Sequence, residues 1–175
     1  MNTTSKVLMI AVAAVALAAC KPKVKEDPNT GATVDSGPTT GTVTDTGPAT
    51  SGMYGPGDLD TDACLRQRVV YFDFDQDAVR GEAAAVLACH AKYLRDRPSA
   101  RMSLEGSADE RGSREYNLGL GERRGNAVSS AIQANGGSGS QITVVSYGEE
   151  RPTCTESSED CWARNRRVEI VYTAK

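Results

Sequence analysis

Asp109, Asn117 and Arg124 could line one pocket and bind a ligand through charge pairing and hydrogen bonds. Asp109 lies in a turn between Gly106 and Gly112, and Asn117 and Arg124 are seven residues apart in the helix predicted to follow. Seven residues make almost two helical turns, so both side chains lie on nearly the same face, about 10 Å apart along the axis. An acid, an amide and a guanidinium therefore converge.

Arg124 falls inside the apolar stripe of this predicted helix. The stripe recurs at helical spacing and consists of Tyr116, Leu120, Ala127, Val128 and Ala131. An inward guanidinium without a partner is costly, so Asp109 or a ligand must supply a carboxylate. Two interpretations stay open: a binding site, or a structural salt bridge beside a solvated face that carries Arg114, Glu122 and Arg123.

The elements that must position these residues follow from the apolar periodicity. They are a strand at 69–74, a helix at 79–97, a strand at 102–104, a helix at 113–135, a strand at 142–147, a short helical turn at 158–163 and a strand at 168–172. The order β-α-β-α-β-(α)-β predicts an α/β fold (an α+β sandwich). It contains one mixed four-stranded sheet covered by helices on one face.

Residues 1–19 are predicted to be a lipoprotein signal peptide. Lys6 gives a positive start, an apolar run follows, and Leu17-Ala18-Ala19, with small residues immediately before the cysteine, leads into Cys20. This pattern is typical of a lipobox, in which the cysteine becomes the lipid-modified N-terminus; a plain secretory signal is the alternative. By analogy with sorting in enteric bacteria, Lys21 favours the outer membrane over the inner one.

Residues 20–57 are predicted to be a lipidated N-terminus followed by a flexible linker. The segment is rich in Gly, Pro, Thr and Asp and has almost no large apolar residues, so it cannot bury enough surface to offset its ordering entropy. A coil of about 37 residues spans roughly 30–35 Å, and about 120 Å when fully extended. Residues 58–175 then suit one domain with one core.

Four cysteines remain beyond the predicted lipobox, an even number in a chain predicted to be exported. Cys154 and Cys161 flank a polar stretch and would staple that loop, whereas Cys64 and Cys89 pair by elimination. Two buried free thiols are the alternative to this second bridge. The sequence has no Cys-x-x-Cys pair or histidine cluster, so no metal site is predicted, and its only histidine, His90, is interpreted as a packed helix residue.

Four separated motifs closely resemble the peptidoglycan-associated lipoproteins of Gram-negative bacteria, which carry an OmpA-like domain. They are Tyr71-Phe72-Asp73-Phe74-Asp75, residues 105–124, Ser146-Tyr147-Gly148 and Asn165-Arg166-Arg167-Val168. The resemblance covers about residues 69–172. It implies a non-catalytic lipoprotein without a cofactor, anchored in the outer membrane by lipid at Cys20, with its domain facing the periplasm. Such a protein tethers the outer membrane to peptidoglycan, and a periplasmic β-propeller protein of the Tol division system is an implied partner.

The resemblance also implies a ligand and the residues that bind it. The ligand is the peptidoglycan stem peptide, whose diaminopimelate carries a free ammonium and a carboxylate. Asp109 would accept the ammonium, Arg124 would hold the carboxylate in a two-pronged contact, and Asn117 would help orient Arg124. The other implied site residues are Phe72, Asp73, Phe74, Ser107, Ala108 and Arg166. Core packing is the alternative role for the two phenylalanines.

Two other functions are compatible with some of these residues. Ser107 stands where the family often has a histidine, which keeps open a structural scaffold that binds only periplasmic proteins. The acids Asp73, Asp75, Asp109 and Glu110 could form the acid pair of a glycan hydrolase, but no nucleophile and base accompany them convincingly. Nucleic-acid binding is disfavoured, because the formal net charge is -3 and no basic run is present.

Overall fold

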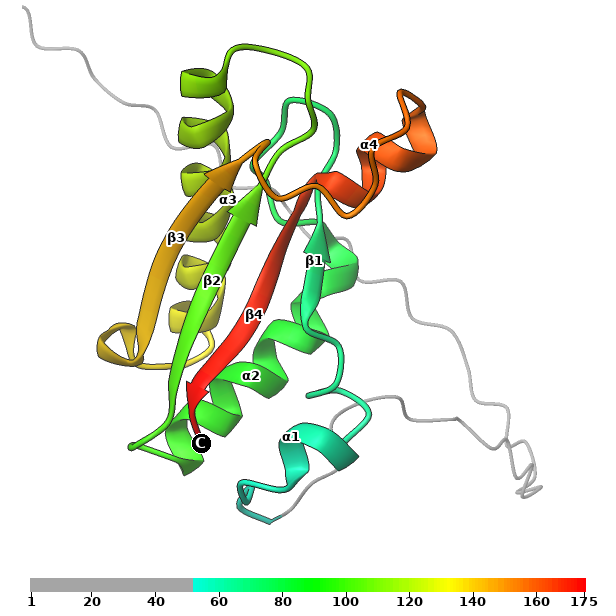
Figure 1. Cartoon of the computed structure of the whole chain (residues 1–175). Helices are drawn as coiled ribbons and strands as arrows, with labels where there is room; N and C mark the ends of the chain where they lie inside the picture. The colour runs from blue at the N-terminus through cyan, green and yellow to red at the C-terminus, as the bar shows by residue number, and fades with distance from the viewer. Residues whose placement is uncertain (1–51) are drawn as a thin grey trace, which may run out of the picture. The chain divides into compact units, whose positions relative to one another are not determined.

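Alternating apolar residues build a four-stranded sheet in the computed structural model, which describes residues 52–175 (Figure 1). The strands are β1 (Val69–Tyr71), β2 (Arg101–Ser107), β3 (Ile142–Gly148) and β4 (Arg167–Ala174). Their order across the sheet is β1-β4-β2-β3. Strand β4 is antiparallel to both of its neighbours, whereas β2 and β3 are parallel. The predicted mixed sheet is confirmed.

The two long helices cover one face of this sheet (Figure 1). The helical elements are α1 (Asp58–Thr61), η1 (Gly81–Ala83), α2 (Ala84–Asp96), α3 (Arg114–Ala134), η2 (Gly139–Gln141) and α4 (Glu159–Asn165). Between the long helices and the sheet lies a core that includes Leu87, Leu94, Leu104, Val128 and Ile170. Ser113 caps the start of α3, because its side chain accepts a hydrogen bond from the Tyr116 N–H.

A close backbone contact fixes helix α3 against strand β2. A Cβ atom on Gly106 would collide with the backbone of Gly121, and one on Gly121 would collide with the side chain of Ser146. Only glycine allows this approach. Gly106 lies just before the Asp109 turn, and Gly121 lies one helical turn before Arg124. The contact between the two glycines therefore sets the distance between Asp109 and Arg124.

The structure corrects two predicted boundaries. Strand β1 ends at Tyr71, three residues earlier than predicted, although the Phe72 N–H still donates to the Arg166 carbonyl at 3.0 Å. The folded region begins before residue 58, because Tyr54 is buried, its N–H donates to Asp96 at 2.8 Å, and its ring lies 6.2 Å from that of Tyr93. The predicted linker therefore ends earlier than residue 57. The predicted signal peptide and Cys20 lie outside the described residues.

Residues 52–175 contain two disulfides, with the pairing predicted. Cys64 and Cys89 join the segment before β1 to helix α2, with their Cα atoms 6.3 Å apart, and Cys154 and Cys161 close the loop that leads into α4, with Cα atoms 5.3 Å apart. In residues 52–175 no helix has the length and apolar character needed to cross a membrane.

Candidate functional site

The Asp109 carboxylate lies at the C-terminal end of β2 and is almost completely buried. Its Oδ1 accepts hydrogen bonds from the N–H and Nε of Arg111, both at 3.1 Å. Its Oδ2 accepts from Arg111 Nη2 at 2.7 Å and from Arg166 Nη1 at 3.2 Å. Burial raises the pKa of Asp109, but the hydrogen bonds from Arg111 and Arg166 outweigh it and hold this pKa below its ordinary value. Asp109 is therefore a carboxylate at neutral pH.

Arg124 points inward as predicted, but three backbone carbonyls hold it instead of a carboxylate. Its Nε donates to the carbonyl of Gln76 at 2.8 Å, Nη1 to that of Ser107 at 2.9 Å and Nη2 to that of Asp73 at 3.1 Å. Burial lowers the pKa of Arg124 to about 10, and the Asp109 charge partly opposes this shift. The side chain is fully buried and still charged. Residues 73–76 form a turn beside the guanidinium, and the carbonyls of Asp73 and Gln76 take the place of the predicted direct contact with the Asp109 carboxylate.

The Asn117 amide supports the Asp109 turn, and its role in orienting Arg124 stays a prediction. Its Nδ2 donates to the Asp109 carbonyl at 3.1 Å and to Glu149 Oε2 at 2.5 Å. The amide thus ties the turn after β2 to the end of β3, while Arg124 is held from the other side.

Asp109, Asn117 and Arg124 nevertheless open onto one pocket of about 220 Å³, together with Phe74. Its lining consists of Phe74, Asp75, Asp109, Arg111, Gly112, Tyr116, Asn117, Leu120 and Arg124. A negative and a positive group therefore face the same small space, as the spacing predicts.

The other predicted site residues support the pocket from behind. Phe72 is a core residue with its ring 5.2 Å from the Arg124 guanidinium, and Asp73 and Ser107 contribute carbonyls to Arg124. Ala108 is buried, and its N–H donates to Gly148 at 2.8 Å. These residues are not part of the pocket lining.

Arg166 is buried and links three parts of the site. Besides Asp109, its guanidinium donates to the carbonyl of Phe72 at 3.1 Å and to Glu159 at 2.7 Å. It connects the residue that follows strand β1, the Asp109 turn and helix α4, and it lies behind the pocket.

Sequence reasoning missed Asp75 and Tyr116 as pocket residues. Asp75 has a φ of 55°, an unusual backbone for a non-glycine residue that often marks a functional turn. The Tyr116 hydroxyl donates to Asp75. Tyr116 was predicted to be part of the core stripe, but it is 44% exposed and lines the pocket.

Arg111 and Trp162 form a second missed feature at the rim of the pocket. The Arg111 guanidinium contacts two aromatic rings, 4.0 Å from the Phe74 centroid and 4.1 Å from that of Trp162. Glu110 accepts hydrogen bonds from Trp162 Nε1 at 3.1 Å and from Ser157 at 2.8 Å. Trp162 is far in sequence from Glu110 and Arg111, so no local pattern signals its contact with them.

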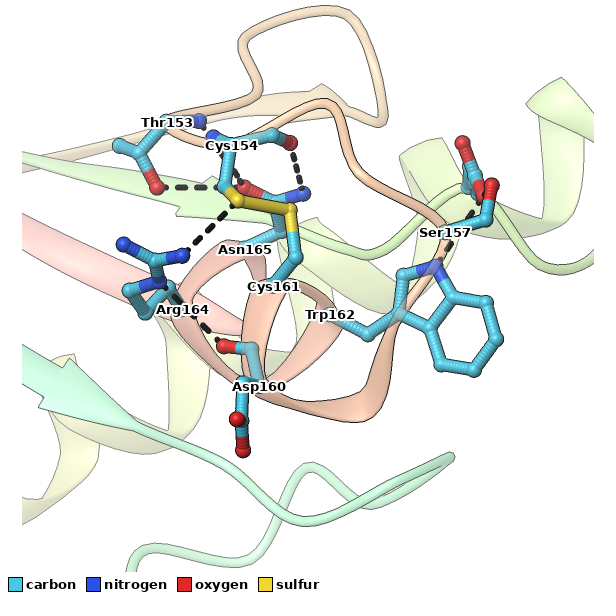
Figure 2. Close-up of a disulfide and its surroundings, with 9 residues drawn as sticks. Thr153, Cys154, Ser157, Asp160, Cys161, Trp162, Arg164 and Asn165 are labelled. Carbon is cyan, nitrogen blue, oxygen red and sulfur yellow. Dashed lines mark hydrogen bonds between the residues drawn. A yellow bond between two sulfur atoms is a disulfide. The ribbon is translucent and has the colours of Figure 1, made fainter.

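The loop that presents Trp162 is held by the Cys154–Cys161 disulfide (Figure 2). Figure 2 shows the Asn165 side chain beside this bond, where its Oδ1 accepts from the Thr153 N–H at 2.9 Å and its Nδ2 donates to the Cys154 carbonyl at 2.8 Å. The disulfide joins the two ends of the loop, and Asn165 holds its first end at Thr153 and Cys154. Trp162 directly follows the second cysteine.

Comparison with known proteins gives a consistent result. Residues 71–166 match the model of the OmpA family. The chain is 40% identical to a peptidoglycan-associated lipoprotein of Pseudomonas putida, over 94% of this chain and 95% of that protein. It is 35% identical to one of Haemophilus influenzae, over 98% of this chain and 100% of that protein.

Solved structures agree with this assignment. A peptidoglycan-associated lipoprotein from Burkholderia pseudomallei superposes with a TM-score of 0.65 at 40% identity, over 66% of this chain and 98% of that one. The C-terminal domain of Helicobacter pylori MotB shares the fold, with a TM-score of 0.55 at 20% identity, over 61% of this chain and 83% of that one. The chain belongs to the OmpA family and, within it, to the peptidoglycan-associated lipoproteins.

Proposed function

We propose that this protein binds peptidoglycan non-covalently through the zwitterionic end of the diaminopimelate in the stem peptide. The observation that carries this proposal is the pocket in which a buried carboxylate, Asp109, and a buried guanidinium, Arg124, face the same space. The names of the relatives, peptidoglycan-associated lipoproteins, support the same ligand class.

Arg124 retains donors for a ligand carboxylate. A guanidinium has five N–H donors, and among the described residues three carbonyls accept from it. One N–H on each terminal nitrogen is left, and these two can form the two-pronged contact that a carboxylate prefers. The carbonyls hold the guanidinium in place before the ligand arrives, which lowers the entropy cost of binding.

The acids of the site suit binding better than hydrolysis. A general acid needs a raised pKa, whereas hydrogen bonds from Arg111 and Arg166 hold the pKa of Asp109 below its ordinary value. Hydrogen bonds from Trp162 and Ser157 likewise lower the pKa of Glu110. Both groups remain charged and engaged with neighbours, as expected for a recognition site.

The proposal extends to a tether between two layers of the cell envelope. Residues 1–19 act as the signal peptide, lipid on Cys20 anchors the chain in the outer membrane, and the segment before Gly52 spans the distance to a periplasmic domain. A β-propeller protein of the Tol system is the protein partner that the family resemblance adds.

Co-sedimentation with purified sacculi tests this function. The full chain in detergent is compared with Asp109→Asn, Arg124→Gln and the matched surface control Arg114→Gln, after each is shown to be folded by circular dichroism. Wild type and the control should sediment and be released by free diaminopimelate, while the two site variants stay in solution. A folded wild type that does not sediment would overturn the proposal and favour a scaffold that binds only proteins.

A further inference from the structure

The Asp109 carboxylate is saturated with hydrogen bonds from two arginines. A carboxylate offers about four lone-pair sites, and Arg111 and Arg166 together donate four hydrogen bonds to it. A ligand ammonium can therefore reach this carboxylate only by taking the place of a guanidinium N–H.

Arg111 is the partner that can leave. Arg166 has a side chain only 7% exposed and is also held by the Phe72 carbonyl and by Glu159. The side chain of Arg111 is 30% exposed and lines the pocket. A second carboxylate, Glu159, already lies 3.5 Å from its Nη1. Arg111 can move from Asp109 without losing every anion around it.

The aromatic contacts of Arg111 permit such an exchange. The Arg111 guanidinium lies 4.0 Å from the Phe74 ring centroid and 4.1 Å from that of Trp162. These cation–π contacts hold the group at the rim through the ring faces and do not use its N–H donors. The donors can therefore change partner while the aromatic contacts persist.

We propose that Arg111 is an exchangeable counter-ion of Asp109, which makes the pocket select ligands that carry an ammonium and a carboxylate together. This inference rests on the proposed function and adds its specificity. The ligand ammonium replaces Arg111 at Asp109, and the ligand carboxylate is bound by Arg124 and by the released Arg111. Both charges of the separated Asp109–Arg111 pair then have a new partner. A ligand with only an ammonium leaves Arg111 with one anion, Glu159, in place of the two beside it now, and a ligand with only a carboxylate cannot displace Arg111 from Asp109.

Calorimetry with two matched tripeptides tests the selectivity. The side chain of the third residue in L-Ala-D-Glu-meso-diaminopimelate ends in an ammonium and a carboxylate, whereas that of L-Ala-D-Glu-L-Lys ends in an ammonium alone; the C-terminal α-carboxylate of both peptides is blocked as the amide. The full chain in detergent should prefer the first peptide by more than about tenfold, the value of a charge-assisted hydrogen bond. Arg111→Gln should bind the lysine peptide more tightly than wild type does, so that the preference falls by about tenfold. The control Arg114→Gln, at an exposed pair with Glu150, should retain the wild-type preference.

Equal weakening of both peptides by Arg111→Gln would show that Arg111 only supports the pocket, and an unchanged preference would show that it takes no part in selection. Either result overturns the inference. A wild type that binds neither peptide contradicts the proposed function itself, so the two failures are distinguishable.

Trp162 supplies a second readout that needs no variant. It is the only tryptophan of the chain and stacks on Arg111, so movement of Arg111 should change its fluorescence. Saturation of wild type with the diaminopimelate peptide should shift the Trp162 emission, and saturation of Arg111→Gln should not. Calorimetric binding to wild type without a change in emission would show that Arg111 stays in place, which contradicts the exchange.

Discussion

Two buried basic side chains, Arg124 and His90, lie near opposite ends of the sheet, and at neutral pH the first is a cation whereas the second is neutral. Both are fully buried on helices that cover the same face. Arg124 reaches the carbonyl of Ser107 at the end of β2, whereas His90 contacts Tyr172, which pairs with Met102 near the start of that strand.

His90 is enclosed by protein partners and has lost its charge. Its Nε2 lies 3.0 Å from the Gln67 carbonyl and must donate to it, so Nδ1 accepts from the Tyr172 hydroxyl at 2.9 Å. Burial lowers the pKa of His90 to about 4, whereas Arg124 has a pKa of about 10 and remains a cation. Burial of a basic side chain therefore does not by itself indicate a binding site. A binding site is indicated when the buried side chain keeps its charge, lines a pocket and has N–H donors without a protein acceptor.

Replacement of Arg124 or His90 by glutamine should separate the binding role of the first from the packing role of the second. Arg124→Gln should have the largest effect on stability and binding. Arg124→Gln leaves carbonyls without donors and should lower the free energy of unfolding by about 3 kcal/mol. It should also weaken sacculus binding by about a hundredfold. His90→Gln keeps some hydrogen bonding and should cost about 1 kcal/mol. Urea unfolding and co-sedimentation measure the two effects, and loss of binding in folded His90→Gln would contradict the comparison.

As the pH falls, protonation of His90 should lower the free energy of unfolding before the charges of the pocket change. The folded pKa of His90 is about 4 and its ordinary value is 6.5. Between these values the unfolded chain takes up a proton that the folded chain refuses. The stability present above pH 6.5 is therefore lost as the pH falls toward 4, by about 3 kcal/mol in total.

Urea unfolding of wild type and His90→Gln at several pH values checks this expectation. The variant should lose much less stability between about pH 6.5 and 4 than wild type does. Asp109, whose pKa lies below its ordinary value of 3.8, and Arg124 keep their charges over this range. An equal pH dependence in the two proteins would assign the acid sensitivity to other groups.

Removal of either disulfide should change stability less than Arg124→Gln or acidification does. The two removals should differ in their effect on ligand binding, because one bond lies near the pocket and the other near His90. Cys154→Ser with Cys161→Ser should cost about 2 kcal/mol and weaken binding of the diaminopimelate peptide several-fold, because Trp162 loses its support. Cys64→Ser with Cys89→Ser, beside His90, should lower stability without weakening binding. Thermal unfolding and calorimetry measure both pairs. Equal binding losses would show that the Cys154–Cys161 loop has no special relation to the pocket.

The sequence predicts those features that depend on local periodicity. The strand and helix order, the inward direction of Arg124 and the packed position of His90 all follow from apolar spacing, because each is a property of one element. The carbonyls that hold Arg124 come from Asp73, Gln76 and Ser107, and tertiary packing alone brings these backbone groups together.

The partners of Asp109 could not be predicted for the same reason. Arg111 looks like an ordinary surface residue of the turn until Trp162, far away in sequence, is placed against it. The buried position of Tyr54 was also missed, since a lone tyrosine among glycines and prolines resembles a linker in composition.

The burial of Tyr54 has a mechanical consequence for a tether. Tyr54 packs on Tyr93, and Tyr93 packs on Tyr172 with ring centroids 5.0 Å apart, so the chain enters the domain at the end of the sheet remote from the pocket. A pull between a membrane anchor and a bound cell wall would then run along the strands and load their hydrogen bonds together. The Cys64–Cys89 bond would carry part of that force covalently into helix α2.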